Sequence, residues 1–419
     1  MSYNIETLPN GVRLVTEPMD SVRSGALGIW VATGSRAEGA GESGAAHFIE
    51  HMLFKGTTEN TAAQLAARMD AIGGQINAFT TKECTCFYVH ALDSHLMEGL
   101  DILTGMFFHS KFDQKDVETE RGVVLEEMGM YQDDPADLVS ERLAAAVYRG
   151  TPLARPILGR KAALEQMTGA WLRDYKESHY RPDKVVVSLA GSYPPEVVQA
   201  IRQRFSAMAP GKTAKLRPGR YTPGITLKRR ATEQNHVILA FPGLTSSDPR
   251  RFALQVLNSV LGGGMSSRLF QQVRERQGLC YNIYSYGSSY ADIGVYCIAT
   301  AQSRDTESRA ITSIRQVVEE IADSGITAEE LHRARELAKA NVLMGMESTT
   351  AHMNLMARSL LNGEAILTPD DIIAAYDAVT LQQVKDLAAD LFQWENASLS
   401  AVGRVMEKEA YAQLISPQA

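Results

Sequence analysis

The stretch Val185-Val-Val-Ser-Leu-Ala-Gly191 decides the fold, because a similar stretch, Ala397-Ser-Leu-Ser-Ala-Val-Gly403, follows 212 residues later. Each stretch is a short apolar run closed by glycine, and each comes after an amphipathic helical pattern. Thr168 ahead of the first stretch returns at the same spacing as Thr380 ahead of the second. The repeat predicts a duplicated chain whose halves both end in the same helix-then-strand unit.

A basic segment rich in proline and glycine, Pro210 to Gly224, lies at the midpoint of the 419-residue chain. Such a segment is typical of a linker between domains. We therefore expect a first domain of residues 1–212, a linker of residues 213–224 and a homologous second domain of residues 225–419. Strand-like alternation and helical periodicity are mixed in both halves. This mixture favours the α+β class, with an antiparallel-rich mixed sheet in each half and helices packed on one face.

The composition is that of a folded globular protein, with 45% hydrophobic and 22% charged residues. Lys and Arg number 42 against 49 Asp and Glu, so the net charge is −7, the wrong sign for a nucleic-acid-binding protein. The chain begins without a basic and apolar leader and contains no apolar run of membrane-spanning length, which predicts a cytoplasmic protein without membrane contact. Four scattered cysteines predict reduced thiols rather than disulfides.

The segment His47-Phe-Ile-Glu50-His51 carries the clearest chemical signal. In a helix, His47 and His51 project from one face, where two neutral imidazoles can bind a single zinc ion. Glu50 shares that face and can accept a proton from a water molecule. Two histidines one turn apart are common on helix surfaces, but the glutamate between them completes the inverted zinc-peptidase signature.

A catalytic zinc ion usually has three protein ligands, and the acidic segment Glu118 to Glu127 is the best source of the third. Glu120 and Glu127 are two helical turns apart and share one stripe, whereas Glu126 is turned about 100° away. Two turns span about 10.5 Å, so only one of the pair can bind the ion. The other can accept a hydrogen bond from a ligating histidine. The spacing alone leaves open which of the two glutamates binds the ion and which supports the histidine. An acidic run is also often only a solvated helix face.

These motifs resemble the pitrilysin, insulysin and mitochondrial processing peptidase family of zinc endopeptidases. The similarity covers Gly44 to Thr57, Gly73 to Thr80 and Glu120 to Glu127, in order and at near-usual spacing. The resemblance implies one zinc ion per catalytic chain, with these roles: His47, His51 and Glu127 as ligands, Glu50 as general base, and Glu120 as the carboxylate that supports a ligand.

Two further segments are similar to this family. The segment Asn77-Ala78-Phe79-Thr80 looks like the family's edge strand, which implies that these four residues bind extended substrate through main-chain hydrogen bonds. The segment Gly262 to Tyr281 is similar to the C-terminal signature, which implies that Arg274 and Tyr281 reach the substrate and the reaction intermediate. A surface arginine and a half-buried strand tyrosine are the structural alternative.

The second half contains no His-x-x-Glu-His segment. Aligning Met128-Gly-Met130 with Met344-Gly-Met346 places Leu343 opposite Glu127, so this half is predicted to be non-catalytic. The resemblance implies that it completes a substrate chamber together with a second chain. That chain is either an identical copy, in a homodimer, or a non-catalytic paralogue, in a heterodimer.

The sequence therefore predicts a zinc-dependent endopeptidase that hydrolyses unfolded or short polypeptides. The first alternative is a non-catalytic peptide-binding or assembly subunit of the same fold, which would require a damaged motif. The second is a structural zinc site, which usually has four protein ligands that include cysteine. Neither motif segment contains a cysteine.

Overall fold

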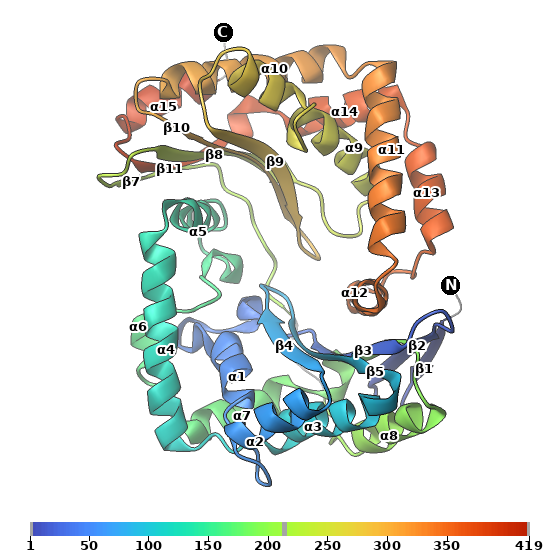
Figure 1. Cartoon of the computed structure of the whole chain (residues 1–419). Helices are drawn as coiled ribbons and strands as arrows, with labels where there is room; N and C mark the ends of the chain where they lie inside the picture. The colour runs from blue at the N-terminus through green and yellow to red at the C-terminus, as the bar shows by residue number, and fades with distance from the viewer. Residues whose placement is uncertain (1–2, 212–215, 417–419) are drawn as a thin grey trace. The chain divides into compact units, whose positions relative to one another are not determined.

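The computed structural model describes residues 3–211 and 216–416 (Figure 1), so residues 213–215 of the predicted linker lie outside the described residues. The chain forms two compact units, and neither is continuous in sequence. The first unit consists of residues 1–128, 155–217 and 345–368, and the second of residues 129–154, 218–344 and 369–419.

A six-stranded sheet forms the centre of the first unit. Its strand order is β1-β2-β6-β3-β5-β4, with β2 parallel to β6 and the other neighbours antiparallel. β6 is buried along its whole length, which explains why its residues are apolar apart from Ser188. The strands are β1 (Asn4–Thr7), β2 (Arg13–Pro18), β3 (Ser24–Val31), β4 (Gln75–Thr80), β5 (Thr85–Leu92) and β6 (Val185–Gly191).

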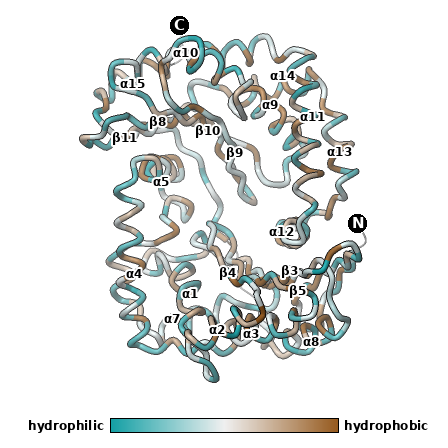
Figure 2. Tube along the Cα trace, viewed as in Figure 1, coloured by the Kyte–Doolittle hydropathy of each residue, from teal (hydrophilic) through white to brown (hydrophobic). Residues whose placement is uncertain are grey.

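A five-stranded sheet of order β7-β11-β8-β10-β9 forms the centre of the second unit. It repeats the order and directions of β2-β6-β3-β5-β4, including one parallel pair, β7 with β11. Figure 2 shows hydrophobic residues along β8 and β10. The predicted α+β class with two homologous halves is confirmed. The strands are β7 (Ile225–Arg229), β8 (Asn235–Gly243), β9 (Asn282–Ser289), β10 (Gly294–Gln302) and β11 (Ser398–Gly403).

The repeated stretches found in the sequence are β6 and β11, and each follows a helix capped by a repeated threonine. The Thr168 side chain accepts a hydrogen bond from the backbone N–H of Trp171 at the start of α7 (Gly169–His179). The Thr380 side chain does the same for Gln383 at the start of α14 (Leu381–Leu391). The threonines recur because each satisfies a backbone donor at a helix start.

Most helices of the first unit pack on one face of its sheet around a core that includes Phe48, Leu100 and Leu172. This layer contains α1 (Ala45–Leu53), α2 (Ala62–Ala71), α3 (Leu96–His109), the first part of α4 (Gln114–Asp133), α6 (Lys161–Leu164), α7 and α8 (Pro195–Ser206). Short 3₁₀ turns connect these elements: η1 (Ser35–Ala37), η2 (Ala40–Glu42), η3 (Asp93–His95) and η5 (Pro182–Lys184).

The second unit has a corresponding helical layer whose core includes Leu257, Ile314 and Leu387. Its elements are α9 (Arg251–Gly262), the π-helical segment η6 (Phe270–Glu275), α10 (Glu307–Ser324), α11 (Ala328–Gly345), α13 (Pro369–Asp377), α14 and α15 (Lys408–Ile415). The 3₁₀ turns η4 (Pro152–Ala154) and η7 (Trp394–Asn396) also belong to this unit. In the part of the chain that the structure describes, we find no helix with the length and apolar character needed to span a bilayer.

The second face of each sheet is covered by a helix from the other half of the sequence. Helix α12 (Thr349–Asn362) packs on β3 and β6, and α5 (Pro135–Val147) packs on β8 and β11. The repeated serine of each sheet binds its helix: Ser188 Oγ donates to the carbonyl of Met353 at 2.9 Å, and Ser400 Oγ donates to that of Val139 at 2.8 Å. The expectation of helices on one face was therefore incomplete.

This exchange of helices crosses the division predicted at residues 213–224. The boundary between domains 1–212 and 225–419 stays a prediction about the duplicated halves of the sequence. The compact units are a different division, because each takes one helical segment from the opposite half.

A buried ion pair fixes α12 on the first sheet. His352 Nδ1 lies 2.8 Å from Glu17 Oε2 on β2, and His352 Nε2 lies 2.8 Å from the carbonyl oxygen of Met346. Both partners are hydrogen-bond acceptors, so the doubly protonated imidazolium satisfies the site. The hydrogen bond to Glu17 accordingly raises the pKa of His352 above its ordinary value.

We expect His352→Leu to lower the free energy of unfolding by about 3–5 kcal/mol at pH 6, because Glu17 loses its partner in the interior. Because the pKa of His352 is raised in the folded state, its contribution to the free energy of unfolding is complete below its ordinary pKa. The contribution is lost as the pH rises through the raised value. Urea unfolding at pH 6 and pH 9 measures this, with exposed His332→Leu as the control. An equal loss at both pH values would contradict the prediction.

Candidate metal centre and active site

Helix α1 carries the His-x-x-Glu-His segment, and its first turn is built around Gly44. Gly44 has φ 102°, and a Cβ there would lie 2.8 Å from the carbonyl oxygen of Leu158, so only glycine fits. The carboxyl group of Glu38 accepts hydrogen bonds from the backbone N–H groups of Gly44 (2.8 Å) and Ala46 (2.9 Å). Phe48 and Met52 anchor the helix in the core. The metal-binding candidates are therefore held on a helix fixed at its start and along its apolar face.

Glu38 was missed by sequence reasoning. The signal was a glutamate shortly before a helix that begins with glycine, since such a carboxylate can satisfy free backbone donors. Burial raises the pKa of Glu38 to about 8, although the two backbone hydrogen bonds and the charges of Arg155 and Lys82 oppose the rise. Glu38 thus positions the helix from within the interior.

The structure brings His47, His51 and Glu127 together. The two rings lie 4.5 Å apart between centroids, and the Nε2 atom of each is 3.6 Å from the same Glu127 Oε2 atom. These separations are longer than hydrogen bonds. With metal–ligand bonds of about 2.1 Å, tetrahedral geometry places ligand atoms about 3.4 Å apart. The three groups can therefore hold one metal ion.

The protonation state of the histidines also fits a metal. Burial, together with the neighbouring His51, lowers the pKa of His47 to about 4, so its imidazole is neutral at physiological pH. A metal ion binds neutral imidazole through a free lone pair. Two imidazoles and one carboxylate are a donor set that suits catalytic zinc, because the fourth position remains open.

Glu120 lies behind His51. His51 Nδ1 is 2.8 Å from Glu120 Oε1, and Lys55 Nζ is 2.5 Å from Glu120 Oε2. A hydrogen bond from Nδ1 to the carboxylate leaves the Nε2 lone pair of His51 directed toward Glu127. Lys55 was not predicted, although its place four residues after His51 is the spacing at which side chains meet along one helical face. Glu126 is exposed, as its place on the helix predicts.

We expect Glu120→Ala to weaken metal binding by about 10–100-fold, because His51 loses the group that orients its ring. Competition with a chromophoric zinc chelator measures the affinity. Glu126→Ala on the same helix is the matched control and should leave the affinity unchanged. Unaltered affinity in Glu120→Ala would rule out this supporting role.

Glu50 lies on α1 between the two histidines and is tied to strand β4. The Thr80 hydroxyl donates a hydrogen bond to Glu50 Oε2 at 2.5 Å. Burial raises the pKa of Glu50, while the hydrogen bond from Thr80 and the charge of His51 oppose the rise. A raised carboxyl pKa brings proton transfer closer to neutral pH. This position and this pKa shift allow Glu50 to take part in acid–base chemistry.

Strand β4, which contains the predicted substrate-binding residues, lies at the edge of the first sheet beside α1 (Figure 1). Within the described residues it pairs with β5 on one side and with no strand on the other. Ala78 packs toward the α1 face, whereas the Phe79 ring packs on Trp30, 5.4 Å between centroids, toward the α12 face. Asn77 Oδ1 accepts a hydrogen bond from the Ala78 backbone. The unpaired backbone of β4 can accept an extended peptide.

Arg274 and Tyr281 lie in the second unit and are close to each other. The Arg274 guanidinium lies over the rings of Phe270, at 4.4 Å, and Tyr281, at 5.5 Å, while Tyr281 is 73% exposed. The stacking holds the arginine in place. Contact of either residue with substrate stays a prediction.

The second unit carries a polar cavity where the first carries its histidines. Helix α9 follows β8 as α1 follows β3, and α9 presents Gln255, Asn258 and Ser259 to a cavity of about 340 Å³. The cavity's lining contains no imidazole, carboxylate or thiol among the described residues. Amide and hydroxyl groups of this kind do not suit zinc. That the second half is non-catalytic stays a prediction.

Comparison with known proteins identifies the family. The model named Insulinase (Peptidase family M16) matches residues 13–161, and the model named Peptidase M16 inactive domain matches residues 166–337. The chain belongs to the insulinase family, peptidase family M16. The family resemblance inferred from the motifs is thereby confirmed.

Relatives of similar length carry protease names. The uncharacterized zinc protease YmxG of Bacillus subtilis is 42% identical over 92% of this chain and 95% of that protein. An uncharacterized zinc protease of Streptomyces coelicolor is 39% identical over 96% of this chain and 90% of that protein. These matches support a peptidase of the metalloprotease class.

Solved structures share the fold. A structure described as the peptidase M16 inactive domain from Pseudomonas fluorescens has a TM-score of 0.90 at 20% identity, covering 97% of this chain and 98% of that chain. A protease from Helicobacter pylori has a TM-score of 0.89 at 19% identity, covering 96% of this chain and 99% of that one. At these identities the likeness concerns the fold alone.

Proposed function

We propose that this chain is a zinc-dependent endopeptidase that hydrolyses unfolded or short polypeptides. The observation that carries the proposal is the arrangement on α1. The Nε2 atoms of His47 and His51 face one carboxylate oxygen of Glu127. Glu50, which lies between the two histidines in the sequence, accepts a hydrogen bond from Thr80 on the edge strand β4. Metal ligands, a proton acceptor and a peptide-binding edge therefore meet within one unit.

In this proposal His47, His51 and Glu127 hold the zinc ion, and Glu120 orients His51. When bound, zinc acts as a Lewis acid that lowers the pKa of a water molecule and polarises a carbonyl group. Glu50 removes the proton from the attacking water and delivers it to the leaving amine. The hydrogen bond from Thr80 keeps the Glu50 carboxylate in position for both transfers.

Substrate binding is assigned to the free edge of β4, Asn77 to Thr80. Main-chain hydrogen bonds to this edge hold a peptide of almost any sequence, but only in an extended conformation. Unfolded or short polypeptides meet that requirement. Three further parts of the proposal rest on the family resemblance. Arg274 and Tyr281 contact the substrate, a second chain of the same or a related sequence takes part, and each catalytic chain binds one zinc ion.

Metal removal tests the proposed function. We expect a quenched peptide with both termini blocked to be cleaved by the zinc-loaded protein, because an endopeptidase needs no free terminus. Dialysis against a chelator should abolish cleavage, and zinc should restore it whereas magnesium should not, since nitrogen ligands favour zinc.

Metal analysis of the dialysed and restored samples is the control for this experiment. A protein that retains zinc and binds peptides but cleaves none of a varied series is a non-catalytic subunit instead. Cleavage that continues after zinc has been removed would exclude the proposed chemistry.

A further inference from the structure

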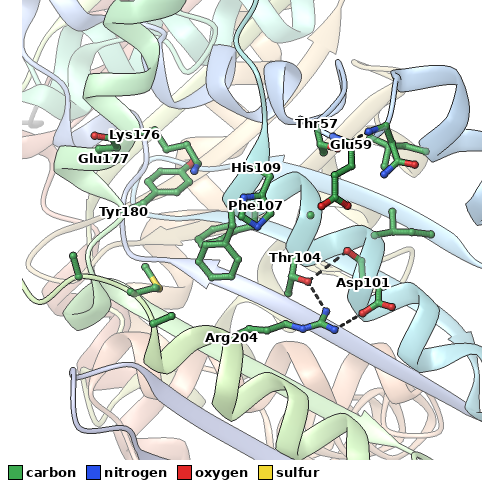
Figure 3. Close-up of a pocket in the computed structure, with 18 of the residues that line it drawn as sticks. Thr57, Glu59, Asp101, Thr104, Phe107, His109, Lys176, Glu177, Tyr180 and Arg204 are labelled. Atoms are coloured by element: carbon green, nitrogen blue, oxygen red, sulfur yellow. Dashed lines mark hydrogen bonds and ion pairs between the residues drawn. The ribbon is translucent and has the colours of Figure 1, made fainter.

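The first unit contains a cavity of about 820 Å³ that the peptidase proposal does not use (Figure 3). It is lined by residues of α2, α3, α7 and α8 and of the segment between α1 and α2, and none of the metal-binding candidates lines it. Phe107, Phe108, Leu65 and Met208 supply apolar walls. The volume lies in the range that accommodates a small organic ligand.

Two arginines that line this cavity have acidic partners. Arg204 pairs with Asp101 and also donates to Thr104, and Arg68 pairs with Glu98 at 2.8 Å. Lys176 differs from them, because among the described residues it makes neither a hydrogen bond nor an ion pair.

The surroundings of Lys176 are aromatic. Its ammonium lies 5.3 Å from the centroid of the Phe107 ring and 5.9 Å from that of Tyr180, and Figure 3 shows it beside the Tyr180 ring. Burial lowers the pKa of Lys176 to about 8, although the charge of Glu177 opposes the lowering. An anion in the cavity would supply the missing interaction.

The duplicated half shows that the fold does not require a lysine at this place. At the 212-residue spacing of the repeat, Lys176 corresponds to Ala388 and Tyr180 to Phe392. Both counterparts are buried in the core of the second unit. A small apolar residue therefore satisfies the packing at the corresponding place of the second unit.

We propose that this cavity binds a small organic carboxylate with an apolar body, whose carboxylate pairs with Lys176 while its apolar part packs on Phe107 and Phe108. A monoanion matches the single ammonium group of Lys176, since the neighbouring Arg68 and Arg204 already have acidic partners. Glu59 and Glu177 also line the cavity, but both are exposed, where solvent weakens their charge. The occupant is therefore an anion rather than a cation.

Calorimetric titration at pH 7 with N-acetyl-L-phenylalanine tests the proposal on the full-length protein. We expect saturable one-to-one binding, at least tenfold weaker binding of the neutral N-acetyl-L-phenylalanine amide, and none of the cationic L-phenylalanine amide. Lys176→Met should weaken binding of the anion at least tenfold, and Lys161→Met, at an exposed lysine, should not. Equal binding of all three probes, or unchanged affinity in Lys176→Met, would overturn the proposal.

A second variant tests the cavity without changing the charge of Lys176. Gly105 lines the cavity within α3, and a Cβ there would meet no atom within 4 Å. Leucine at this place should fill the space and favour the helix, so Gly105→Leu should fold normally and lose binding. If Lys176→Met fails to fold, this variant decides the question. Full binding in folded Gly105→Leu, or no saturable binding of N-acetyl-L-phenylalanine by the unaltered protein, excludes the site.

Discussion

Glu50→Gln is expected to lower kcat for peptide cleavage by about 10²–10⁴-fold while the zinc content stays the same. Glutamine preserves the size of the side chain and can still bond to Thr80, but its amide cannot accept the proton of the attacking water. Because Glu50 is not among the three groups that face one another as ligands, the metal should remain. Steady-state kinetics on a quenched peptide and metal analysis of the same sample measure both effects.

The control for this variant is Glu126→Gln, an exposed glutamate on α4. It should cleave at the normal rate, which separates the loss of a particular base from the loss of one negative charge. If Glu50→Gln keeps normal kcat with zinc bound, another group accepts the proton. If it loses zinc, Glu50 contributes to the metal site instead.

Glu38→Ala is expected to lower the free energy of unfolding by about 3 kcal/mol at pH 6, because the backbone N–H groups of Gly44 and Ala46 lose their acceptor in the interior. Helix α1 should then shift at its start, and zinc affinity should fall about tenfold or more. A carboxyl group whose pKa is raised in the folded state makes its full contribution to the free energy of unfolding below its ordinary pKa. This contribution is lost as the pH rises through about 8. The stability loss should therefore be smaller at pH 9.

Urea unfolding and chelator competition at both pH values measure this prediction. Glu38→Gln retains an acceptor and cannot ionise, so it should be less destabilised and show a weaker pH dependence. Glu42→Ala is the matched control, because within the described part of the chain Glu42 accepts a hydrogen bond only from the backbone N–H of Gly39 in the preceding turn. A Glu38→Ala protein with unchanged zinc affinity would show that Glu38 does not position the metal-binding helix.

The sequence predicted most of what depends on local spacing. The i, i+4 spacing of His47 and His51 and the shared stripe of Glu120 and Glu127 follow from helix geometry, and the structure brings these side chains together. The spacing could not decide which glutamate faces the metal position, because both lie on one stripe. The duplication was visible because the Thr168 cap and its copy satisfy backbone groups in both halves.

Contacts between distant segments were not predictable in the same way. Helical periodicity shows that α12 has an apolar face but not which sheet it covers. One signal was present, since the apolar residues of β6, broken only by Ser188, indicate a strand buried on both faces. Glu38 and Lys55 were missed because their partners are set by tertiary folding.

The exchanged helix also bears on how this protein is made. Trp30 and Val186 on the first sheet are covered by Met353 and Met356, which are synthesised more than 160 residues after Val186. The histidine-bearing unit is therefore still missing a layer when the ribosome has completed the first half of the chain. Its hydrophobic sheet face stays open until most of the polypeptide has emerged. Translation that stops near the midpoint yields an incomplete protein rather than a smaller hydrolase.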